Sequence, residues 1–551
     1  MPDNAPNAAT AGRTVRDVTF DAFRRRGLTT LFANPGSTEV PFLTDLPGDL
    51  EFVLALHESS VVGLAAGYAL GRGAPSLALL HTTAGLGNGV SAIATARVNR
   101  APVVILVGQQ DRRHLAYEPF LTGRLAGLAG DYPVRVEQPA RAQDVPAAVE
   151  RAFHAAMTQR GPALVIVPMN DWEAAPDDER EPAAALGEVV RAVAVAPEVV
   201  DSLAAFLDGA RSPALVVGAG ADDAVARAAV VALAERLSAP VYQEAFGARA
   251  GFPHDHPLFA GLLPAGRPGL RERLAPYDAL LVVGCPAFRQ SFYAPGRLTM
   301  PGTRIAVVTE DAEEAYRSPA ELALLASPAS VCTALASRVA ARDARPSMPF
   351  QPPDPPAPPA DGEPLRASHV LAALAERLPP DAVVLEEAPV DRPELQERMP
   401  ASEPFGYLSA AMGGLGFAVP GATGMRMALP DRPVVAVIGD GSTIYGVQGL
   451  WSAAHYRVGV LFVVLSNGGY AIMDRLAENH GGVPPWPSFA EVELATVARG
   501  FGCPARRIVT HKELTRTLDE IGSCPCAARR AAPARRRRSS DGGLRAMRSH
   551  A

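Results

Sequence analysis

The sequence predicts an α/β protein built from three doubly wound parallel sheets, one in each of three domains. Short apolar runs, typical of buried parallel strands, alternate with helical segments along most of the 551 residues. Many of these runs end in glycine, asparagine, serine or histidine, residue types that mark the ligand-binding ends of such strands. A proline-rich stretch at 343–365 reads as an extended linker. We therefore expect a first domain at 12–182, a middle domain at 190–342 and a third domain at 366–521.

Composition narrows the class of protein before any motif is considered. A hydrophobic fraction of 48% and a charged fraction of 20% are enough for large cores, and a net charge of −6 argues against nucleic-acid binding. Five cysteines give no disulfide framework, which favours a reducing compartment. The first residues do not read as a signal peptide, and no apolar run is long enough to span a membrane. We expect a cytoplasmic protein that binds neither nucleic acid nor membrane.

The first domain follows the strand and helix pattern in order. We expect a helix at 14–26, strands at 31–33, 51–56, 76–80, 103–107 and 163–167, a helix at 59–70, and a glycine-rich turn at 81–88. Glu58 stands between an apolar strand and an almost uncharged helix. A carboxyl in such surroundings is a candidate catalytic group. The alternative is an ordinary acid at a helix N-terminus, where the helix dipole favours it.

The middle domain offers a weaker signal. A strand at 213–217 leads into Gly218-Ala219-Gly220-Ala221, and one GxG without the rest of the fingerprint is weak evidence for a nucleotide site. Another strand, at 279–283, opens into a loop at 284–293. No nucleotide is assigned to this domain on that evidence.

Two strand ends in the third domain carry the strongest motif. The apolar run 434–438 ends in Gly439-Asp440-Gly441, and the run 458–465 ends in Ser466-Asn467-Gly468-Gly469. Adjacent parallel strands bring their carboxyl ends together, so Asp440 and Asn467 should converge. Carboxylate, amide and carbonyl oxygens suit Mg²⁺. Two ordinary strand-to-loop turns are the alternative, but the spacing of the two motifs makes a metal site the better interpretation.

This pair of motifs resembles the signature of the thiamine diphosphate-dependent enzymes. The resemblance implies that Asp440, Asn467 and the Gly469 carbonyl hold Mg²⁺, which binds the diphosphate. It also implies cofactor contacts from Gly441, Ser442 and Tyr470. In the glycine run 409–417, the same resemblance assigns the Gly413 carbonyl to the 4′-amino group of thiamine diphosphate. Leu415 is then the bulky residue that supports the bent cofactor.

The first domain resembles that of the benzoylformate decarboxylase family. Four motifs show the resemblance. In order, they are Asn34-Pro35-Gly36-Ser37, His57-Glu58, the HTTAGLGN stretch at 81–88 and GQQ at 108–110. The resemblance implies that Glu58 contacts N1′ of the aminopyrimidine and that Ser37 and His81 are active-site residues. A turn-capping serine and a structural histidine are the alternatives.

Two stretches depart from the family pattern. Ser291 stands where the family has a second catalytic histidine, so we assign Ser291 to the site in its place. Residues 387–390 read Glu-Ala-Pro-Val, where the family has serine and threonine for the diphosphate.

The function implied is non-oxidative decarboxylation of a 2-keto acid to an aldehyde and CO₂. Apolar wall candidates suggest an aryl or branched substrate: Phe120, Leu121, Leu408 and Leu476. The family builds its sites between subunits, which implies a homodimer or homotetramer. A thiamine-dependent carboligase or lyase, an acetolactate-synthase-like enzyme and a catalytically impaired relative remain open.

The sequence changes character after about residue 521. From Cys524 to the last residue it carries eight arginines and one aspartate, with almost no apolar periodicity. A basic tail for an anionic surface is one interpretation. We favour a disordered or aberrant end for 522–551, because the strand expected to complete the third domain does not appear.

Overall fold

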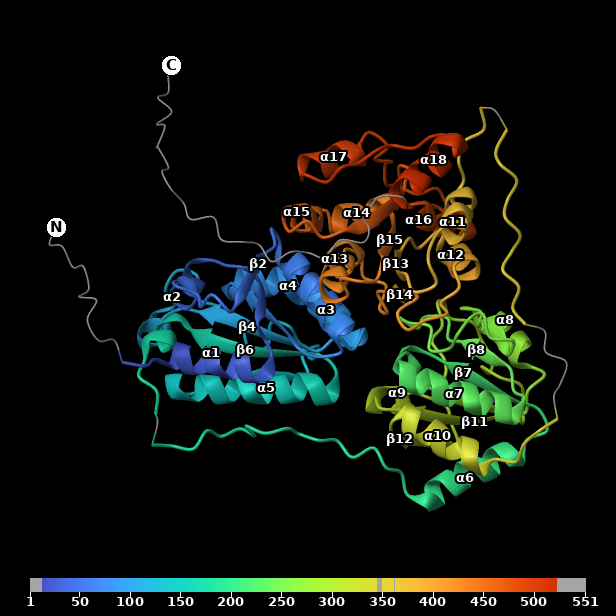
Figure 1. Cartoon of the computed structure of the whole chain (residues 1–551), viewed down its shortest axis with the longest axis horizontal. Helices are drawn as coiled ribbons and strands as arrows, with labels where there is room; N and C mark the ends of the chain where they lie inside the picture. Colours follow the sequence, from blue (N-terminus) through green and yellow to red (C-terminus); the bar gives the residue numbers. More distant parts are fainter. Residues whose placement is uncertain (1–11, 178, 344–348, 361, 523–551) are drawn as a thin grey trace.

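Three lobes, each containing one parallel sheet, make up the protein (Figure 1). The structure is a computed structural model that describes residues 12–177, 179–343, 349–360 and 362–522. The predicted fold class, three doubly wound α/β domains, is confirmed. In the described part of the chain, no helix is both long and apolar enough to cross a membrane. The basic tail predicted after residue 521 falls almost entirely outside the described residues.

The first sheet has six strands in the order β2-β1-β3-β4-β6-β5. Their bounds are β1 Thr30–Asn34, β2 Glu51–Leu54, β3 Ser76–Leu80, β4 Val103–Gln109, β5 Arg135–Glu137 and β6 Pro162–Pro168. Helices α1 (Val15–Arg26) and α5 (Val145–Gln159) pack in the core on one face, and α3 (Glu58–Arg72) and α4 (Thr82–Val98) pack on the other. Helix α1 begins at a capping box in which Thr14 and Asp17 bond each other's backbone N–H.

The middle sheet also has six strands, in the order β12-β11-β10-β7-β8-β9. They are β7 Pro213–Val217, β8 Val241–Gln243, β9 Phe259–Leu262, β10 Ala279–Val283, β11 Arg304–Thr309 and β12 Leu322–Leu325. Helices α6 (Pro197–Asp208), α7 (Ala224–Leu237) and α10 (Pro328–Arg338) share one core, and α8 (Arg267–Leu274) lies in the core of the other face. The short α9 (Ala312–Tyr316) follows β11.

The crevice between β7 and β10, where the strand order reverses, is closed by backbone. The Gly220 N–H donates to the Gly284 carbonyl at 2.8 Å. A Cβ on Gly218 would lie 2.6 Å from that of Cys285, so the two loops are in direct contact. A dinucleotide binds at such a switch point only when the crevice is open. The GxG of this domain therefore serves close packing between two loops.

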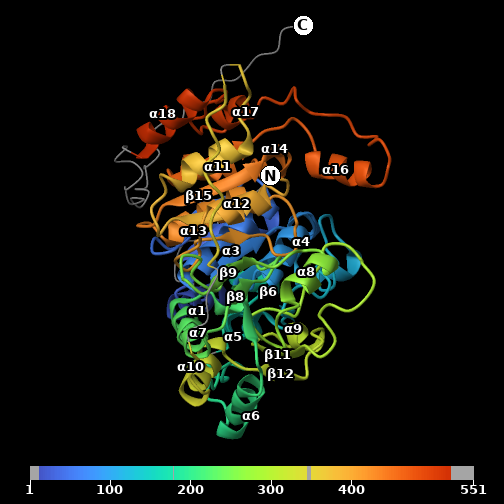
Figure 2. The same ribbon diagram turned by 90° about the vertical axis from the view of Figure 1, so that its right-hand side faces the viewer.

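The third sheet has four strands among the described residues, in the order β14-β13-β15-β16. They are β13 Val383–Glu387, β14 Leu408–Ser409, β15 Val434–Gly439 and β16 Val460–Leu465. The helices are α11 Ala367–Ala375, α12 Arg392–Arg398, α13 Ala418–Ala428, α14 Asp440–Tyr445, α15 Gly449–His455, α16 Ala471–Asn479, α17 Leu494–Gly500 and α18 His511–Gly522. Helix α16 and the loop after it stand apart from the sheet (Figure 2), and α16 has no buried residue.

The first and third domains meet through α3 and α13. Glycines replace side chains along this contact: a Cβ on Gly67 would lie 2.0 Å from the Gly421 carbonyl oxygen, and one on Gly424 would lie 2.0 Å from that of Leu64. Gly63 lies against Pro420, and Gly71 lies against Met425 and Ala428. The two helices therefore run in the same direction through a contact that no larger residue would allow.

Two local predictions are corrected. Residues 82–88, expected as a turn, form the first part of α4, which begins directly after His81. Glycine favours this close packing, because a Cβ on Gly85 would lie 3.2 Å from the Leu80 backbone. The sequence also predicts a tight turn at 439–441 followed by one helix at about 447–455; the structure has α15 in that place, but a separate helix, α14, already starts at Asp440 itself.

Candidate active site

Glu58 begins α3 at the carboxyl end of β2 and is buried. Its carboxylate is held by two amides: Asn34 Nδ2 donates to Oε1 at 3.0 Å, and Asn88 Nδ2 donates to Oε2 at 3.1 Å. Asn34 ends β1 and Asn88 lies in α4, so two further elements of the first domain fix the acid at the start of α3. Two amide donors orient a carboxylate without neutralising it, so the acid keeps its capacity to bind a further donor.

His81 is joined to Glu39, a residue that the sequence reasoning missed. His81 Nδ1 lies 2.9 Å from Glu39 Oε2 and 3.0 Å from Thr38 Oγ1. Glu39 is 1% exposed, and its Oε2 also accepts the Gly36 N–H at 2.7 Å. This arrangement occupies Nδ1 and leaves Nε2 as the nitrogen for proton exchange. The only sequence signal was an acid two residues after Ser37, and its partner lies 42 positions away.

Glycines admit the His81 ring and the Glu39 carboxylate. A Cβ on Gly36 would lie 2.5 Å from the ring of His81, and one on Gly108 would overlap the Glu39 carboxylate. Gly36 belongs to the NPGS turn and Gly108 to the GQQ stretch. The glycines of these two motifs therefore leave room for the side chains of His81 and Glu39.

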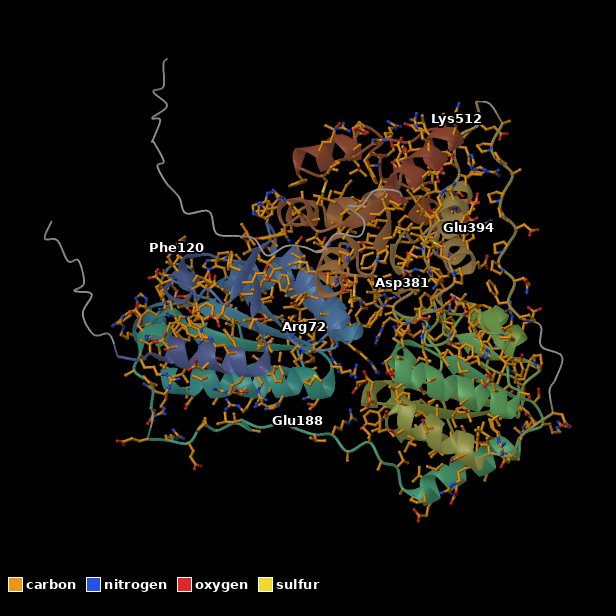
Figure 3. All side chains as sticks on the ribbon, in the orientation of Figure 1. Arg72, Phe120, Glu188, Asp381, Glu394 and Lys512 are labelled. Carbon is orange, nitrogen blue, oxygen red and sulfur yellow. The ribbon has the colours of Figure 1, made fainter. Side chains whose placement is uncertain are left out.

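Ser37 and the two wall candidates of the first domain lie on its open side. Ser37 is exposed at the start of a 3₁₀ turn (Ser37–Glu39) that carries Glu39. Phe120 is 87% exposed, and Figure 3 shows it at the rim of the first domain. Leu121 is half-buried with a positive φ of 69°.

Asp440 and Asn467 are brought together at the carboxyl ends of β15 and β16. Asp440 is 4% exposed, and its Oδ2 accepts the backbone N–H of Asn467 at 2.9 Å and that of Gly468 at 2.7 Å. The Ser466 hydroxyl donates to the same oxygen at 3.1 Å. Asn467 Oδ1 accepts the Gly469 N–H at 3.0 Å. One buried carboxylate thus organises the whole turn that follows β16.

Gly441, Ser442 and Tyr470 surround this turn. A Cβ on Gly441 would lie 2.8 Å from the Tyr470 ring, so only glycine allows the ring to pack there. The ring packs edge-on against Phe489, with centroids 5.1 Å apart. Ser442 is buried in the first turn of α14. N–H groups at a helix start favour a phosphate; in this chain the Gly441 N–H donates to Asp440 Oδ1 at 2.7 Å.

The oxygen atoms of the turn after β16 are suitable ligands for Mg²⁺. The glycine run leaves space for the ring of the cofactor. The described residues contain no cluster of three or more His, Cys, Asp or Glu side chains suited to a metal. A site here therefore depends on the Asp440 carboxylate with the Asn467 amide oxygen and the Gly469 carbonyl, all hard oxygens of the kind that Mg²⁺ prefers. Around Gly413, whose φ is 74°, no atom lies within 4 Å of where a Cβ would be, which leaves space for a ligand.

Glu387 holds the far end of the glycine run. Its Oε1 accepts the Gly416 N–H at 2.5 Å and its Oε2 accepts the Ala418 N–H at 2.6 Å. Burial raises the pKa of Glu387 to about 8, and these backbone donors oppose the shift. Leu415 directly precedes the anchored Gly416 and is half-buried. The Glu387 carboxyl thus shapes the backbone of the glycine run.

The remaining candidates lie elsewhere. Ser291, in the middle domain, is exposed and its hydroxyl lies 3.4 Å from the Ala265 carbonyl. Among the described residues, no hydrogen bond links it to His81 or Glu58. Leu408, expected as a pocket wall, is fully buried in the core as part of β14, so that expectation is wrong. Leu476 is half-buried on α16.

Comparison with known proteins defines the class. Three family models match the chain in order: the N-terminal thiamine pyrophosphate (TPP) binding domain at 13–127, the central domain at 200–335 and the C-terminal TPP binding domain at 394–526. The chain therefore belongs to the thiamine diphosphate-dependent enzymes, thiamine pyrophosphate being the same cofactor.

Within that family the chain is similar to benzoylformate decarboxylases. It is 38% identical to the benzoylformate decarboxylase of Pseudomonas aeruginosa, covering 92% of this chain and 96% of the relative. A 4-hydroxybenzoylformate decarboxylase structure from Rhodococcus jostii matches with a TM-score of 0.88 at 35% identity, covering 92% of this chain and 96% of the other. A putative acetolactate synthase large subunit of Mycobacterium tuberculosis is 28% identical, over 89% of this chain and 93% of the relative.

Proposed function

We propose that this protein is a thiamine diphosphate- and Mg²⁺-dependent decarboxylase that converts an aryl or branched 2-keto acid to an aldehyde and CO₂. The observation that carries the proposal is the pairing of a fixed carboxylate, Glu58, with the oxygen-rich turn of Asp440 and Asn467. These are the residues by which the chain resembles the family, and each lies at the carboxyl end of a parallel sheet. The similarity to benzoylformate decarboxylases supports the substrate class.

Thiamine diphosphate supplies an electron sink for the pair of electrons released when CO₂ leaves. In the proposed site, Asp440, Asn467 and the Gly469 carbonyl bind Mg²⁺, while the start of α14 with Gly441 and Ser442 faces the diphosphate. The Gly413 carbonyl would accept from the 4′-amino group. Tyr470 packs beside the turn, and Leu415 would support the ring.

The first domain supplies the groups that move protons. Glu58, oriented by Asn34 and Asn88, shares a proton with N1′ of the aminopyrimidine. His81, whose Nδ1 is held by Glu39, exchanges a proton with the substrate through Nε2. Ser37 lies on the turn that also carries Glu39 and is exposed toward the open side. We assign Ser291 to binding the substrate carboxylate or a water, because a hydroxyl is too weak an acid to replace an imidazole.

The packing of α3 on α13 supports the proposal of a homodimer or homotetramer. Each helix starts at the carboxyl end of its own sheet, and the two run in the same direction. The carboxyl ends of the first and third sheets in one chain therefore face the same way, not each other. A cofactor held between Glu58 and Asp440 needs facing edges, which a second copy would provide. This supports an active site built from the first domain of one subunit and the third domain of its partner.

An acetolactate-synthase-like or carboligase activity is the second candidate, because relatives of that class align over most of the chain. The closed crevice between β7 and β10 favours the decarboxylase over a flavin-containing member, since the two loops at this switch point are in direct contact.

The test is an assay of the purified protein with Mg²⁺ and thiamine diphosphate. A panel of 2-keto acids with aryl, branched and short side chains is supplied, and CO₂, aldehyde and acyloin are all measured. We expect CO₂ and aldehyde from aryl or branched acids. If acyloin or acetolactate is the main product, the protein is a carboligase and not a decarboxylase. If the protein binds the cofactor but turns over none of the acids, it is a catalytically impaired relative.

A further inference from the structure

The start of the cofactor's glycine run is held from outside its own domain. The Ala411 N–H donates to Asn99 Oδ1 of the first domain at 2.8 Å. Its carbonyl accepts from Arg289 Nη1 of the middle domain at 3.2 Å. Asn99 Nδ2 also donates to the Ser409 carbonyl at 3.1 Å. Ala411 is two residues before Gly413, so both polar groups of this peptide segment are fixed by side chains of the other two domains.

The other end of the run is fixed within the third domain, by Glu387 on the N–H groups of Gly416 and Ala418. Between the two anchors, Gly413 has a left-handed φ of 74° and open space beside it. Glycine has the largest conformational freedom of any residue. The direction of the Gly413 carbonyl therefore depends on how firmly Ala411 and Gly416 are held.

Arg289 is itself well placed for this contact. Its Nη1 also donates to the Phe246 carbonyl at 3.4 Å, and its Nη2 lies 3.9 Å from Glu314 Oε1. The buried Glu244 lies close enough to interact electrostatically, and burial raises its pKa to about 7. Glu314 is also bonded, at 2.8 Å, by Arg100, the residue after Asn99. The contacts of Arg289 and Asn99 thus belong to one junction of all three domains.

We propose that Arg289 is a positioning residue for the cofactor: through the Ala411 carbonyl it sets the direction of the Gly413 carbonyl toward the aminopyrimidine. The inference rests on the proposed function, because the cofactor contact of Gly413 belongs to that proposal. Arg289 lies two residues before Ser291, so the loop that carries Ser291 and the backbone that grips the ring are joined by one side chain. The middle domain then contributes to cofactor geometry without touching the cofactor.

The test compares Arg289→Gln with Arg342→Gln. Arg342 is the matched control, since its Nη2 also donates to two backbone carbonyls, Leu207 at 2.6 Å and Ala210 at 2.8 Å, but inside the middle domain. Calorimetry gives the affinity for thiamine diphosphate in the presence of Mg²⁺, and near-ultraviolet circular dichroism reports the environment of the bound ring. We expect Arg289→Gln to weaken binding roughly tenfold, as loss of one charge-assisted hydrogen bond would, and to change the spectrum.

Rescue separates positioning from general stability. Arg289→Lys keeps a charged donor that reaches the Ala411 carbonyl, so affinity should recover to within about threefold of the native value, with the native spectrum. Equal affinity and spectra for Arg289→Gln and Arg342→Gln would overturn the inference. If Arg289→Gln does not fold, Arg289→Met, which also removes the donor, is compared with Arg342→Met, and no difference in affinity or spectrum overturns the inference. Native protein that binds no cofactor would contradict the proposed function instead.

Discussion

In the first and third domains, the end of one strand is joined to the start of a helix by hydrogen bonds of opposite kinds. In the first domain, Asn34 at the end of β1 donates to Glu58 at the start of α3. In the third domain, Glu387 at the end of β13 accepts from the backbone of Gly416 and Ala418 at the start of α13. The two sheets share the order of their first four strands. The acid therefore lies on the helix in one domain and on the strand in the other.

The different positions of the acid give the two domains different roles. In the first domain an amide on the strand presents a carboxylate that is available for proton transfer. In the third domain the carboxylate is used internally, and bare glycine backbone is left facing the cofactor's place. One architecture thus provides a reactive side chain in one copy and a shaped backbone in the other, and variants on each side should fail in different ways.

Asp440→Ala should have the largest effect, because it removes the charged metal ligand and the acceptor of two backbone N–H groups. We expect Mg²⁺-dependent binding of thiamine diphosphate to weaken at least about 100-fold, since even outer partners of a metal site are worth up to about that much. Calorimetry is the measurement. Asp431→Ala, at an exposed aspartate of the same domain, is the control. A folded Asp440→Ala protein with unchanged binding would remove the metal assignment.

Glu58→Gln should leave cofactor binding nearly intact and slow exchange of the cofactor's C2 hydrogen. The amide cannot share a proton with N1′, and its NH₂ would face a donor amide of Asn34 or Asn88. The expected loss is about 10²- to 10⁴-fold, the usual range for general acid–base catalysis. Hydrogen–deuterium exchange at C2, followed by NMR, checks it against Glu51→Gln at an exposed position of β2. Native exchange rates in the variant would assign Glu58 a structural role only.

Titration of Glu387 should make the third domain less stable as pH rises. Burial raises the pKa of this acid from 4.5 to about 8. The folded state then holds a proton that the unfolded state releases, so stability is unaffected below about pH 4.5 and falls until about pH 8, by roughly 1.4 kcal/mol for each unit of pKa difference. Thermal melting against pH should show a steeper decline in the native protein than in Glu387→Gln. Parallel profiles would contradict this assignment.

A pair of leucine truncations should give the smallest effect and the closest comparison of the two sheets. Leu106 in β4 is 0% exposed, whereas every residue of β16, including Leu461, is only half-buried. Leu106→Ala should cost about 2–5 kcal/mol, and Leu461→Ala about 1 kcal/mol, because less apolar surface leaves water there on folding. Hydrogen exchange of each sheet measures both. Equal losses would mean that β16 is covered in solution.

The fold was predictable from the sequence because buried parallel strands are apolar on both faces, as β4, β10 and β15 are. Asp440 and Asn467 could be paired for the same reason, since adjacent strand ends fix their separation. Sequence could not give Glu39, whose bond to His81 depends on the placement of β1 beside β3. Nor could it place Arg289 against Ala411, 122 positions away, because that contact depends on how two domains dock.

Two errors have the same origin in packing. Residues 82–88 carry two glycines and were expected as a turn, but Gly85 lets α4 lie close to β3. Leu408 was expected to line a pocket as one of four apolar wall candidates. It is instead the core residue of a two-residue strand, paired with Leu385 of β13. Local composition can indicate that two segments of the chain pack closely, but it does not identify the packing partner.

The outer side of β16 has a consequence for the protein at high concentration. In the first sheet, β6 covers the outer side of β4, whereas no strand pairs with β16 on that side within the described residues. The strand, Val460–Leu465, contains neither charge nor proline, the residues that usually protect such edges. Its free N–H and C=O groups can pair with an extended segment of another molecule. Self-association should therefore begin at this edge, rise with concentration in light scattering, and diminish when Val463 is replaced by lysine.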